Sequence, residues 1–379
     1  MENVFIISDN IFSPLGETTE ENFGQLKHGI SGIKQHKDLT KSALPFFASM
    51  FEKEIYFLNG SSANQFTKFE QMLIISIRNA IKDSEVNLRD GKTVLVISST
   101  KGNISLLENE KLNPELKDRI SLSYSASRVA DYFQYKQPPV IISNACISSL
   151  VAMLIAKRLI QSGQYENAVI AGADVISRFV LSGFESFQAI SSSPCKPFDA
   201  DRNGINLGEA AATIVLSSNK KLSGSRITFA GGSISNDANH ISGPSMTGEE
   251  LNQAIQNAMK EARLSSDEID FISAHGTATV YNDEMEAKAI ALAGMTSVPL
   301  NSLKGYFGHT LGAAGLLESI ISIHSMEENV VIPSKGMDRL GVSIPLNICS
   351  SLLPASLSHC LKTASGFGGC NAAVVFSKC

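Results

Sequence analysis

Most of the candidate strands in this 379-residue chain are continuous apolar runs rather than alternating ones. A strand that is apolar at every position is covered on both faces, so such runs indicate sheets buried between other layers. They occur at 94–98 (VLVIS), 140–143 (VIIS), 168–174 (AVIAGAD), 212–217 (ATIVLS), 227–232 (ITFAGG), 271–276 (FISAHG) and 372–376 (AAVVF). Such a chain must also supply helices to cover these sheet faces.

Segments with helical spacing of apolar residues lie between several of these runs. They are 23–30, 69–84, 126–133, 150–163, 249–264, 282–294 and 313–326. Strands that alternate with amphipathic or buried helices predict an α/β fold.

The chain also repeats one arrangement of strand, small-residue turn, apolar helix and strand. The loose echoes pair 138–172 with 298–334 and 208–217 with 366–377. The two similar halves meet near Ser223 to Ser225, which predicts an N-terminal half over residues 1–222 and a C-terminal half over residues 223–379. No low-complexity segment divides them, so we expect the halves to pack as one unit.

Charge and composition narrow the classes of partner. The net charge is −5 and the Lys and Arg residues are scattered, so we expect no nucleic-acid partner. The opening residues lack the basic and long apolar regions of a secretory signal, and no window approaches the roughly 18 apolar residues that span a bilayer. We therefore expect a cytoplasmic protein without membrane insertion.

The six cysteines show neither CxxC nor Cys/His metal spacing, which predicts free thiols and no metal site.

Cys146 stands between a predicted strand and a long apolar helix, in SNACISS (143–149). If the helix begins just after it, free backbone N–H groups and the helix dipole would stabilise a thiolate and lower the pKa of the thiol. Small neighbours such as Ala145 and Ser148 leave room for a substrate. Free cysteine also packs well as a small hydrophobe, so the residue alone permits either a nucleophile or a core thiol.

Two histidines follow predicted strands in the C-terminal half. His275 lies in SAHGTAT and His309 in KGYFGHTLGAAG, positions from which a side chain can point into a cleft. Gly308 and Gly312 are consistent with close backbone approach to a ligand, although a structural histidine in a plain glycine-rich turn would give the same pattern. One thiol with two imidazoles would make a nucleophile with two bases or hydrogen-bond donors.

A carboxylate and a glycine loop complete the candidate residues. Glu318 lies in the apolar run AAGLLESII and needs a partner, for which Lys304 is the natural candidate. The glycines around Phe367 in ASGFGGCN precede a strand. Such a loop presents backbone N–H groups to a developing oxyanion, or it only makes a tight turn.

Five blocks of sequence taken together resemble the elongating β-ketoacyl-ACP synthases of the thiolase superfamily. In family order they are NACISS (144–149), KPFDADRNGINLGEAAATIVL (196–216), AHGTATVYNDEMEAKAI (274–290), NSLKGYFGHTLGAAGLLE (301–318) and GFGGCNAAVVF (366–376). The resemblance implies a thiolase fold, with five αβαβα layers built from two related halves. It also implies a homodimer, or a heterodimer with a related synthase subunit, and acyl carrier protein (ACP) as the substrate carrier.

The resemblance further implies a decarboxylative Claisen condensation. Cys146 would hold an acyl group as a thioester, and malonyl-ACP would lose CO2 and attack it to give β-ketoacyl-ACP, with His275 and His309 as catalytic partners. The amides of Cys146 and Phe367 would form the oxyanion hole, and Lys304 would order the site through Glu318.

Substrate contacts are implied in the same way. Thr277 and Ser242 match positions that bind the phosphopantetheine arm of ACP, while Phe184 and Phe367 resemble aromatic gates at the acyl pocket. No cofactor or metal is implied.

The chain departs from the family pattern at several positions. GEAAA (208–212) replaces the usual GEGAG, Cys370 replaces a threonine, Ser365 stands where a second phenylalanine is common, and Gln188 stands where a basic residue is frequent. These departures leave the acyl chain length and the ACP-docking face open. They favour polyene, polyketide or another specialised pathway over housekeeping fatty acid biosynthesis.

The main alternative is a non-catalytic partner subunit of the chain-length-factor type. Such subunits usually lack the nucleophile, so the combination of Cys146, His275 and His309 favours an acyltransferase. A thiolase would carry its second cysteine before the glycines rather than at Cys370, and initiating condensing enzymes use asparagine where His309 stands. A cysteine hydrolase would need an Asn or Asp that orients one histidine, and the sequence offers no convincing one.

Overall fold

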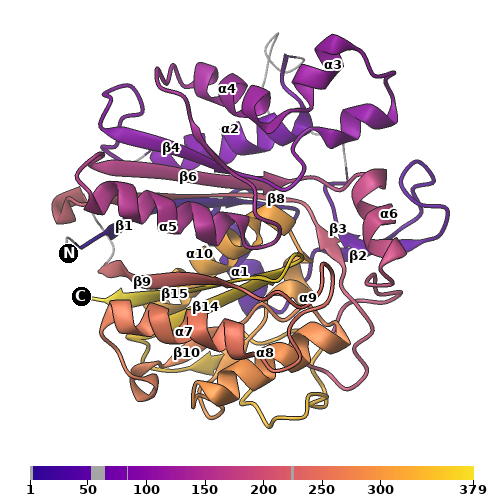
Figure 1. Cartoon of the computed structure of the whole chain (residues 1–379), viewed down its shortest axis with the longest axis vertical. Helices are drawn as coiled ribbons and strands as arrows, with labels where there is room; N and C mark the ends of the chain where they lie inside the picture. The colour runs from indigo at the N-terminus through magenta and orange to yellow at the C-terminus, as the bar shows by residue number, and fades with distance from the viewer. Residues whose placement is uncertain (1–2, 53–64, 83, 223–225) are drawn as a thin grey trace.

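A large mixed sheet runs through the centre of the protein in the computed structural model, which describes residues 3–52, 65–82, 84–222 and 226–379 (Figure 1). Within these residues ten strands join in the order β11-β10-β14-β15-β9-β1-β8-β6-β4-β5. Their bounds are β1 Phe5–Phe12, β4 Thr93–Ser98, β5 Val140–Ile142, β6 Asn167–Asp174, β8 Ala210–Ser217, β9 Ile227–Asn236, β10 Phe271–Ser273, β11 Leu300–Asn301, β14 His359–Gly366 and β15 Cys370–Lys378. The pairing of Phe5 in β1 with Thr228 in β9 connects two five-stranded parts.

The two parts repeat one topology. Numbered in chain order within its part, each has its strands in the spatial order third, second, fourth, fifth, first: β5-β4-β6-β8-β1 and β11-β10-β14-β15-β9. The second, third and fourth strands are parallel in both parts, and the fifth is antiparallel to both neighbours. The shared topology confirms that the chain is built from two related halves.

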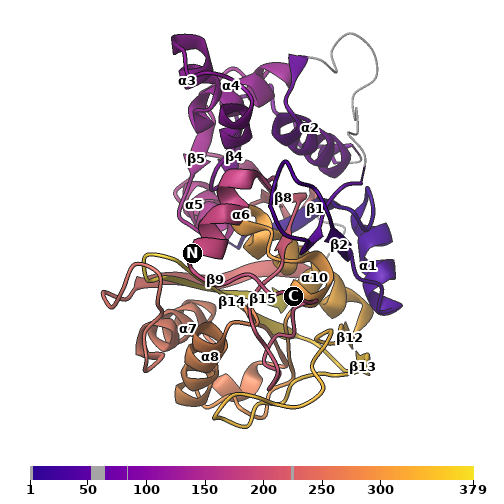
Figure 2. The same cartoon turned by 90° about the vertical axis from the view of Figure 1, so that its right-hand side faces the viewer.

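Helices separate and cover the two parts of the sheet, so that five layers form (Figures 1 and 2). Helices α2 and α4 cover the N-terminal part, α5 and α10 lie between the two parts, and α7 and α8 cover the C-terminal part. Their bounds are α2 Lys68–Ile81, α4 Leu122–Tyr132, α5 Ser148–Gln161, α7 Glu249–Ala262, α8 Val280–Leu292 and α10 Ala314–Glu328. This is the predicted αβαβα arrangement.

The two central helices are apolar on nearly every side because each contacts both parts of the sheet. Their side chains and the inner sheet faces form one hydrophobic cluster that includes Leu150, Leu316 and Phe376. One polar exception on α5 is Lys157, which is buried and donates to the carbonyl of Ala230 at 2.9 Å and to the carboxylate of Glu261 at 2.9 Å. The ion pair ties α5 to α7 of the other half.

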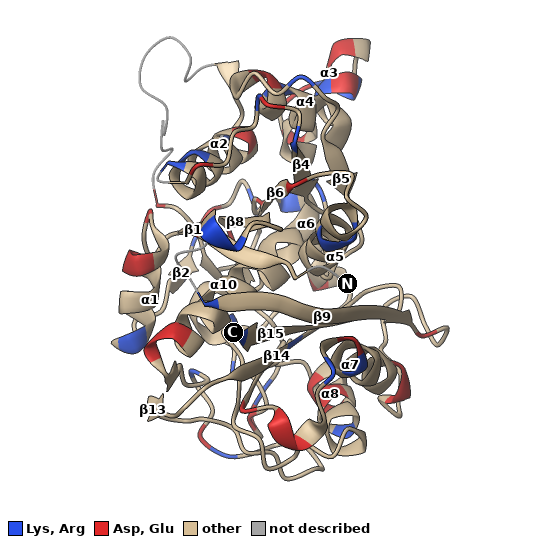
Figure 3. Cartoon of the chain, turned by 90° about the vertical axis from the view of Figure 1, so that its left-hand side faces the viewer, with Lys and Arg blue, Asp and Glu red and all other residues tan. Residues whose placement is uncertain are grey.

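Shorter elements surround this framework. They are α1 Thr19–Lys27, β2 Ile33–His36, β3 Phe46–Ser49, α3 Pro114–Arg119, α6 Arg178–Ser186, β7 Leu207–Gly208, α9 Lys304–Phe307, β12 Val330–Val331 and β13 Leu353–Pro354. Residues of both charge signs are interspersed along the outer helices of the face in Figure 3. Among the helices described, none combines the length and the apolar character needed to cross a bilayer.

Two predicted strands differ from the structure, and one predicted boundary lies outside the described residues. The predicted strand 271–276 ends at Ser273, so the next three residues form a loop. The sequence predicts that residues 330–334 match β6 in the repeat. They do not, because Val330 and Val331 pair with β13 in a separate two-stranded sheet, and β14 takes the position in the large sheet that corresponds to β6. The predicted boundary at Ser223 to Ser225 lies outside the described residues, so the division at 222/223 stays a prediction.

Candidate active site

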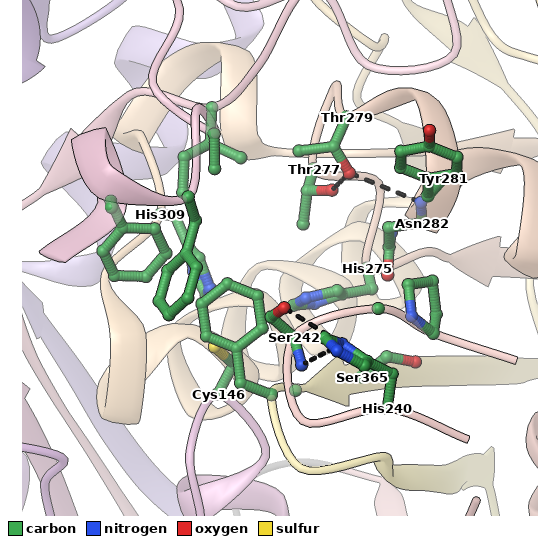
Figure 4. A pocket seen from close by; sticks show the side chains of 18 of the residues that line it. Cys146, His240, Ser242, His275, Thr277, Thr279, Tyr281, Asn282, His309 and Ser365 are labelled. Atoms are coloured by element: carbon green, nitrogen blue, oxygen red, sulfur yellow. Dashed lines mark hydrogen bonds between the residues drawn. The ribbon is translucent and has the colours of Figure 1, made fainter.

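Cys146, His275 and His309 line one pocket of about 400 Å³, and Figure 4 shows their side chains gathered on one side of it. The cysteine comes from the N-terminal half and both histidines from the C-terminal half. All three side chains are buried. The volume is in the range of pockets that bind small molecules.

A tight turn places Cys146 just before α5. Ala145 has a φ of 44°, a left-handed conformation that is strained for a residue with a Cβ. The hydroxyl of Ser148 stabilises the turn, since it donates to the Ala145 carbonyl at 2.6 Å and accepts from the Asn144 amide at 2.8 Å. The helix begins at Ser148, and its N-cap residue Ile147 offers no side-chain hydrogen bond to the first turn. The thiol therefore sits beside an uncapped helix N-terminus, as the sequence predicts.

Burial nevertheless acts against a thiolate. It raises the pKa of the Cys146 thiol to about 12, with Cys370 acting in the same direction, while Lys304 and the Phe367 amide oppose the rise. The predicted lowering of this pKa is therefore wrong, because the thiol lies away from water. The resting sulfur is protonated and must lose its proton during any attack.

Two carboxylates of α8 hold the loop that carries His275. Glu286 accepts from the amides of His275 and Gly276, both at 2.8 Å, and Asp283 accepts from the Thr277 amide at 2.8 Å. Asp283 and Glu286 are three residues apart and therefore lie on one face of the helix. The backbone of His275 is thus fixed by buried, charge-assisted hydrogen bonds.

A segment from the N-terminal half holds His309. The His309 amide donates to the carbonyl of Asn206 at 2.7 Å, and the Gly208 amide donates to the carbonyl of His309 at 3.0 Å. The two backbones approach so closely that a Cβ on Gly208 would lie 1.9 Å from the carbonyl oxygen of Phe307. Gly208, which begins the GEAAA block, is therefore required for the position of His309.

The glycines that flank His309 also serve protein packing rather than ligand approach. A Cβ on Gly308 would lie 2.4 Å from the carbonyl oxygen of Leu207, and one on Gly312 would lie 2.8 Å from the carboxylate of Asp174. Neither glycine lines the pocket. The interpretation of these residues as a ligand approach is wrong.

The two imidazoles face each other edge to face, with ring centroids 5.3 Å apart and planes at 82°. Nδ1 of His275 and both ring nitrogens of His309 are buried without a hydrogen-bond partner in the described residues. Burial, followed by the positive charge of Lys304, holds the pKa of both imidazoles well below the usual value. Two neutral imidazoles with free polar atoms can donate to a polar group of a bound molecule.

Lys304 and Glu318 form the ion pair that the sequence predicts, and both side chains are buried. The ammonium group of Lys304 also donates to the carbonyl of His275 at 3.0 Å. Lys304 thus connects α10 to the loop that carries His275.

The glycine loop between β14 and β15 closes over Cys146. A Cβ on Gly366 would lie 2.9 Å from the Cys146 amide nitrogen, so the two backbones are in close contact. The Phe367 amide donates to the thiol. Its ring stacks on Phe184 at 5.5 Å and meets Phe187 edge to face at 5.2 Å. Three aromatic rings therefore stand together at the pocket.

Thr277 and Ser242 also line the pocket, as the resemblance implies. The hydroxyls of Thr277 and Thr279 are 2.9 Å apart (Figure 4). Ser242 lies in a loop in which the neighbouring Ile241 carbonyl accepts from the Gly368 amide at 2.7 Å. The structure therefore brings every predicted site residue to the pocket or to the groups behind it.

Several residues that build the site were missed from the sequence. Asp283 and Glu286 lie in the block AHGTATVYNDEMEAKAI (274–290). Acidic residues on the buried face of a helix need partners, and this is the signal that could have identified them. Phe187 and Thr279 follow the predicted pocket residues Phe184 and Thr277, and no sequence motif marks either of them. Lys362 lies in β14, which the sequence does not predict as a strand.

The described residues contain no group of three or more His, Cys, Asp or Glu side chains that could hold a metal ion. The cysteines, Cys146 and Cys370 among them, are free.

Family models match both halves of the chain. Residues 1–221 match the family model "Beta-ketoacyl synthase, N-terminal domain", and residues 227–338 match "Beta-ketoacyl synthase, C-terminal domain". The chain is 29% identical to 3-oxoacyl-[acyl-carrier-protein] synthase 2 of Vibrio cholerae, over 99% of each chain.

Solved structures with the same fold include one titled "The ishigamide ketosynthase/chain length factor" (TM-score 0.92, 24% identity, 100% of this chain and 99% of that one). Another contains a type II polyketide synthase acyl-carrier protein in complex with its ketosynthase (TM-score 0.88, 22% identity, 100% of both chains).

Proposed function

The chain belongs to the beta-ketoacyl synthase family, and we propose that it condenses an acyl group, held as a thioester on Cys146, with malonyl-ACP to give β-ketoacyl-ACP. The observation that carries this proposal is one pocket lined by a buried thiol and by two buried imidazoles that keep unpartnered nitrogens. A thioester intermediate divides a difficult condensation into two transfers at one site.

The first transfer loads the acyl group. The Cys146 thiol gives its proton to an imidazole as the sulfur attacks the thioester carbon of acyl-ACP. The negative charge that forms on the carbonyl oxygen is stabilised by the amides of Cys146 and Phe367, a role supported by the close approach of Gly366, the neighbour of Phe367, to the Cys146 amide. The carbon–sulfur bond to the carrier then breaks, and the carrier thiol takes up the proton.

The second transfer begins with malonyl-ACP. The bond to its carboxylate breaks, CO2 leaves, and the electron pair forms an enolate on the thioester. His275 and His309 donate hydrogen bonds to the enolate oxygen, a role that neutral imidazoles can fill without a metal. The enolate carbon attacks the acyl group on Cys146, a carbon–carbon bond forms, and the cysteine thiolate leaves and is reprotonated.

We propose that both substrates enter on the phosphopantetheine arm of ACP, and no other cofactor is invoked. Exposed apolar residues line the pocket: Phe187, Ile241, Val280 and Tyr281. Thr277 and Ser242 offer hydroxyls for the amide groups of the arm, and Phe184 and Phe367 border the space for the acyl chain. A cytoplasmic location, where ACP-linked substrates are made, stays a prediction.

We further propose that the chain pairs with a second copy or with a related synthase subunit. Strand β5 is at one end of the strand order among the described residues and carries the half-buried apolar side chains Val140, Ile141 and Ile142. An apolar edge strand of this kind is a surface for pairing with another chain. Similar solved structures include a ketosynthase with its chain length factor, which supports a related subunit as the partner.

The alternative role is that of a non-catalytic partner subunit. The similarity to ketosynthase/chain-length-factor structures keeps this role open. The assembled Cys146, His275 and His309 favour the catalytic role, because a subunit that only shapes a cavity needs none of them.

Intact-protein mass spectrometry after incubation with acyl-ACP of several chain lengths tests the proposal. We expect the wild-type chain to gain one acyl mass and to release it when malonyl-ACP is added. Cys146→Ala should gain none. The matched control is Cys370→Ser, which removes the neighbouring thiol and should still be acylated. A folded wild-type protein that stays unmodified with every chain length would favour the partner-subunit role.

A further inference from the structure

Behind the two histidines lies a second buried lysine that the reaction as described does not use. Lys362 is in β14, has 0% of its surface exposed, and reaches the same carboxylate as Lys304 from the other side. Its Nζ lies 2.8 Å from Oε2 of Glu318, while Lys304 contacts Oε1. One buried carboxylate therefore faces two buried ammonium groups.

Lys362 also holds the backbone just before His275. Its ammonium group donates to the carbonyls of Ser273 and Ala274, both at 3.2 Å, and to its own neighbour Thr363 at 2.6 Å. Lys304 donates to the next carbonyl, that of His275. Two ammonium groups thus bind three successive carbonyls at the end of β10.

The sheet register explains this arrangement. Ser273 of β10 pairs with Lys362 of β14 in a parallel ladder, so the lysine stands beside the point where β10 ends. Successive side chains of a strand point to opposite faces. Lys362 reaches Glu318 on one face, and Thr363 donates to Glu286 at 2.6 Å on the other. Glu286 in turn binds the amides of His275 and Gly276.

We propose that Lys362 is a positioning residue for the condensation: by sharing Glu318 and binding the carbonyls that precede His275, it fixes that imidazole and keeps positive charge behind it. The inference rests on the proposed function but concerns a residue outside the cysteine and the two histidines.

The contacts of Lys362 favour the protonated amine: burial lowers the pKa of this lysine, and the charge of Glu318 opposes that fall. All of its polar neighbours are acceptors, namely three carbonyls and one carboxylate, and a neutral amine would turn a lone pair toward one of them. Burying an ammonium group is unfavourable unless a charge partner and hydrogen bonds compensate for the lost water. Glu318 already has a partner in Lys304, so a second buried cation is not needed to neutralise it.

The charge acts on the imidazoles in a definite direction. Burial and Lys304 lower the pKa of His275 and of His309, and Lys362 acts in the same direction on both. Removing its charge should therefore let both imidazoles protonate at higher pH, and an imidazolium is a poorer base for the thiol. The titratable and charged groups around the two rings are Cys146, Asp237, His240, Asp283, Glu286, Lys304, Glu318 and Lys362.

Lys362→Met tests the inference, because it keeps the length of the side chain and removes its charge. Lys362→Gln is the second variant, which keeps hydrogen-bond donors without the charge. Lys157→Met is the matched control, since Lys157 is equally buried and paired with Glu261 but lies away from the pocket. Circular dichroism and the urea midpoint identify any variant that fails to fold.

The first measurement is the titration of 13Cε1-labelled histidine followed by NMR, assigned with His275→Gln and His309→Gln, which does not depend on activity. We expect Lys362→Met and Lys362→Gln to raise the pH at which both imidazoles protonate, and Lys157→Met to leave it unchanged. An unchanged titration of both rings in the folded Lys362 variants would overturn the inference, whether or not the protein condenses acyl groups.

The second measurement compares the pH profiles of Cys146 acylation and of malonyl-ACP decarboxylation. We expect Lys362→Met to slow acylation by about tenfold at neutral pH and by more as the pH falls, because a protonated imidazole cannot accept the thiol proton, while decarboxylation changes less. Equal profiles for Lys362→Met and Lys157→Met would count against Lys362. An inactive wild-type protein would instead contradict the proposed function and leave the NMR result to decide the role of Lys362.

Discussion

The carbonyl of His309 accepts a hydrogen bond from the amide of Gly208 at 3.0 Å, so a residue of one half of the chain holds a histidine supplied by the other. The site is therefore assembled across the two halves, with the thiol from one and both imidazoles from the other.

Separate assays of decarboxylation and acylation should distinguish the role of the two histidines from that of the thiol. His275→Ala and His309→Ala should each slow malonyl-ACP decarboxylation by about 10²–10³-fold, because each removes one donor to the enolate. Each single variant keeps one imidazole to accept the thiol proton, so Cys146 should still gain an acyl mass. The double variant should lose both steps. Full decarboxylation by either single variant would contradict the enolate role.

Gly208 does not line the pocket, so Gly208→Ala should displace His309 without adding an atom to the pocket wall. The added Cβ would meet the Phe307 carbonyl oxygen at 1.9 Å, so the segment must shift. We expect a loss of about 1–3 kcal/mol in the free energy of unfolding and at least a tenfold loss of condensation. Gly24→Ala in α1 is the control, because a Cβ there meets nothing within 4 Å. Normal condensation by Gly208→Ala would show that this close approach does not position His309.

Glu318→Gln should be strongly destabilising, because it leaves two buried ammonium groups without their shared counter-charge. We expect a loss of about 3–5 kcal/mol in the free energy of unfolding, measured by urea denaturation. Glu166→Gln removes an exposed partner of Lys92 and should leave the urea midpoint unchanged. A similar small effect at both positions would contradict the buried cluster.

The Glu261 ion pair should make stability depend on pH below neutrality. Burial alone would raise the pKa of Glu261, but hydrogen bonds from Arg158, Lys157 and the Gly232 amide lower it to about 2. A lowered carboxyl pKa stabilises the fold above the unfolded value of 4.5, and the contribution is lost as the pH falls toward about 2. Wild type should exceed Glu261→Gln by about 2–3 kcal/mol at pH 6 and by much less near pH 3, as measured by urea unfolding. A constant difference would contradict the lowered pKa.

The sequence predicts the fold well where strands are uniformly apolar, as in β4, β6, β8 and β15. It misses β14, because Lys362 interrupts the apolar run with a charge whose partner, Glu318, is distant in the sequence. It misreads the glycines beside His309 for a related reason, since the groups that they accommodate lie far earlier in the chain, namely Leu207 for Gly308 and Asp174 and Ser99 for Gly312.

The residues of the candidate site also differ in how far the sequence predicts them. Cys146, His275 and His309 could be found because five blocks in order resemble one family, although each motif alone leaves a structural role open. Among the supports behind them the Lys304–Glu318 pair could be predicted, whereas Asn206 could not, because it acts through a backbone carbonyl that no local pattern reveals. The raised pKa of Cys146 also depends on how completely the finished fold excludes water from the thiol.

The position of β15 has a consequence for the newly made chain. This strand fits between β9 and β14, and the loop before it brings Phe367 against Cys146. In the proposed reaction the Phe367 amide completes the oxyanion hole, and during synthesis this amide emerges from the ribosome long after Cys146. On that proposal a nascent chain carries a thiol that cannot yet accept an acyl group efficiently, and acylation competence is acquired only when β15 is inserted.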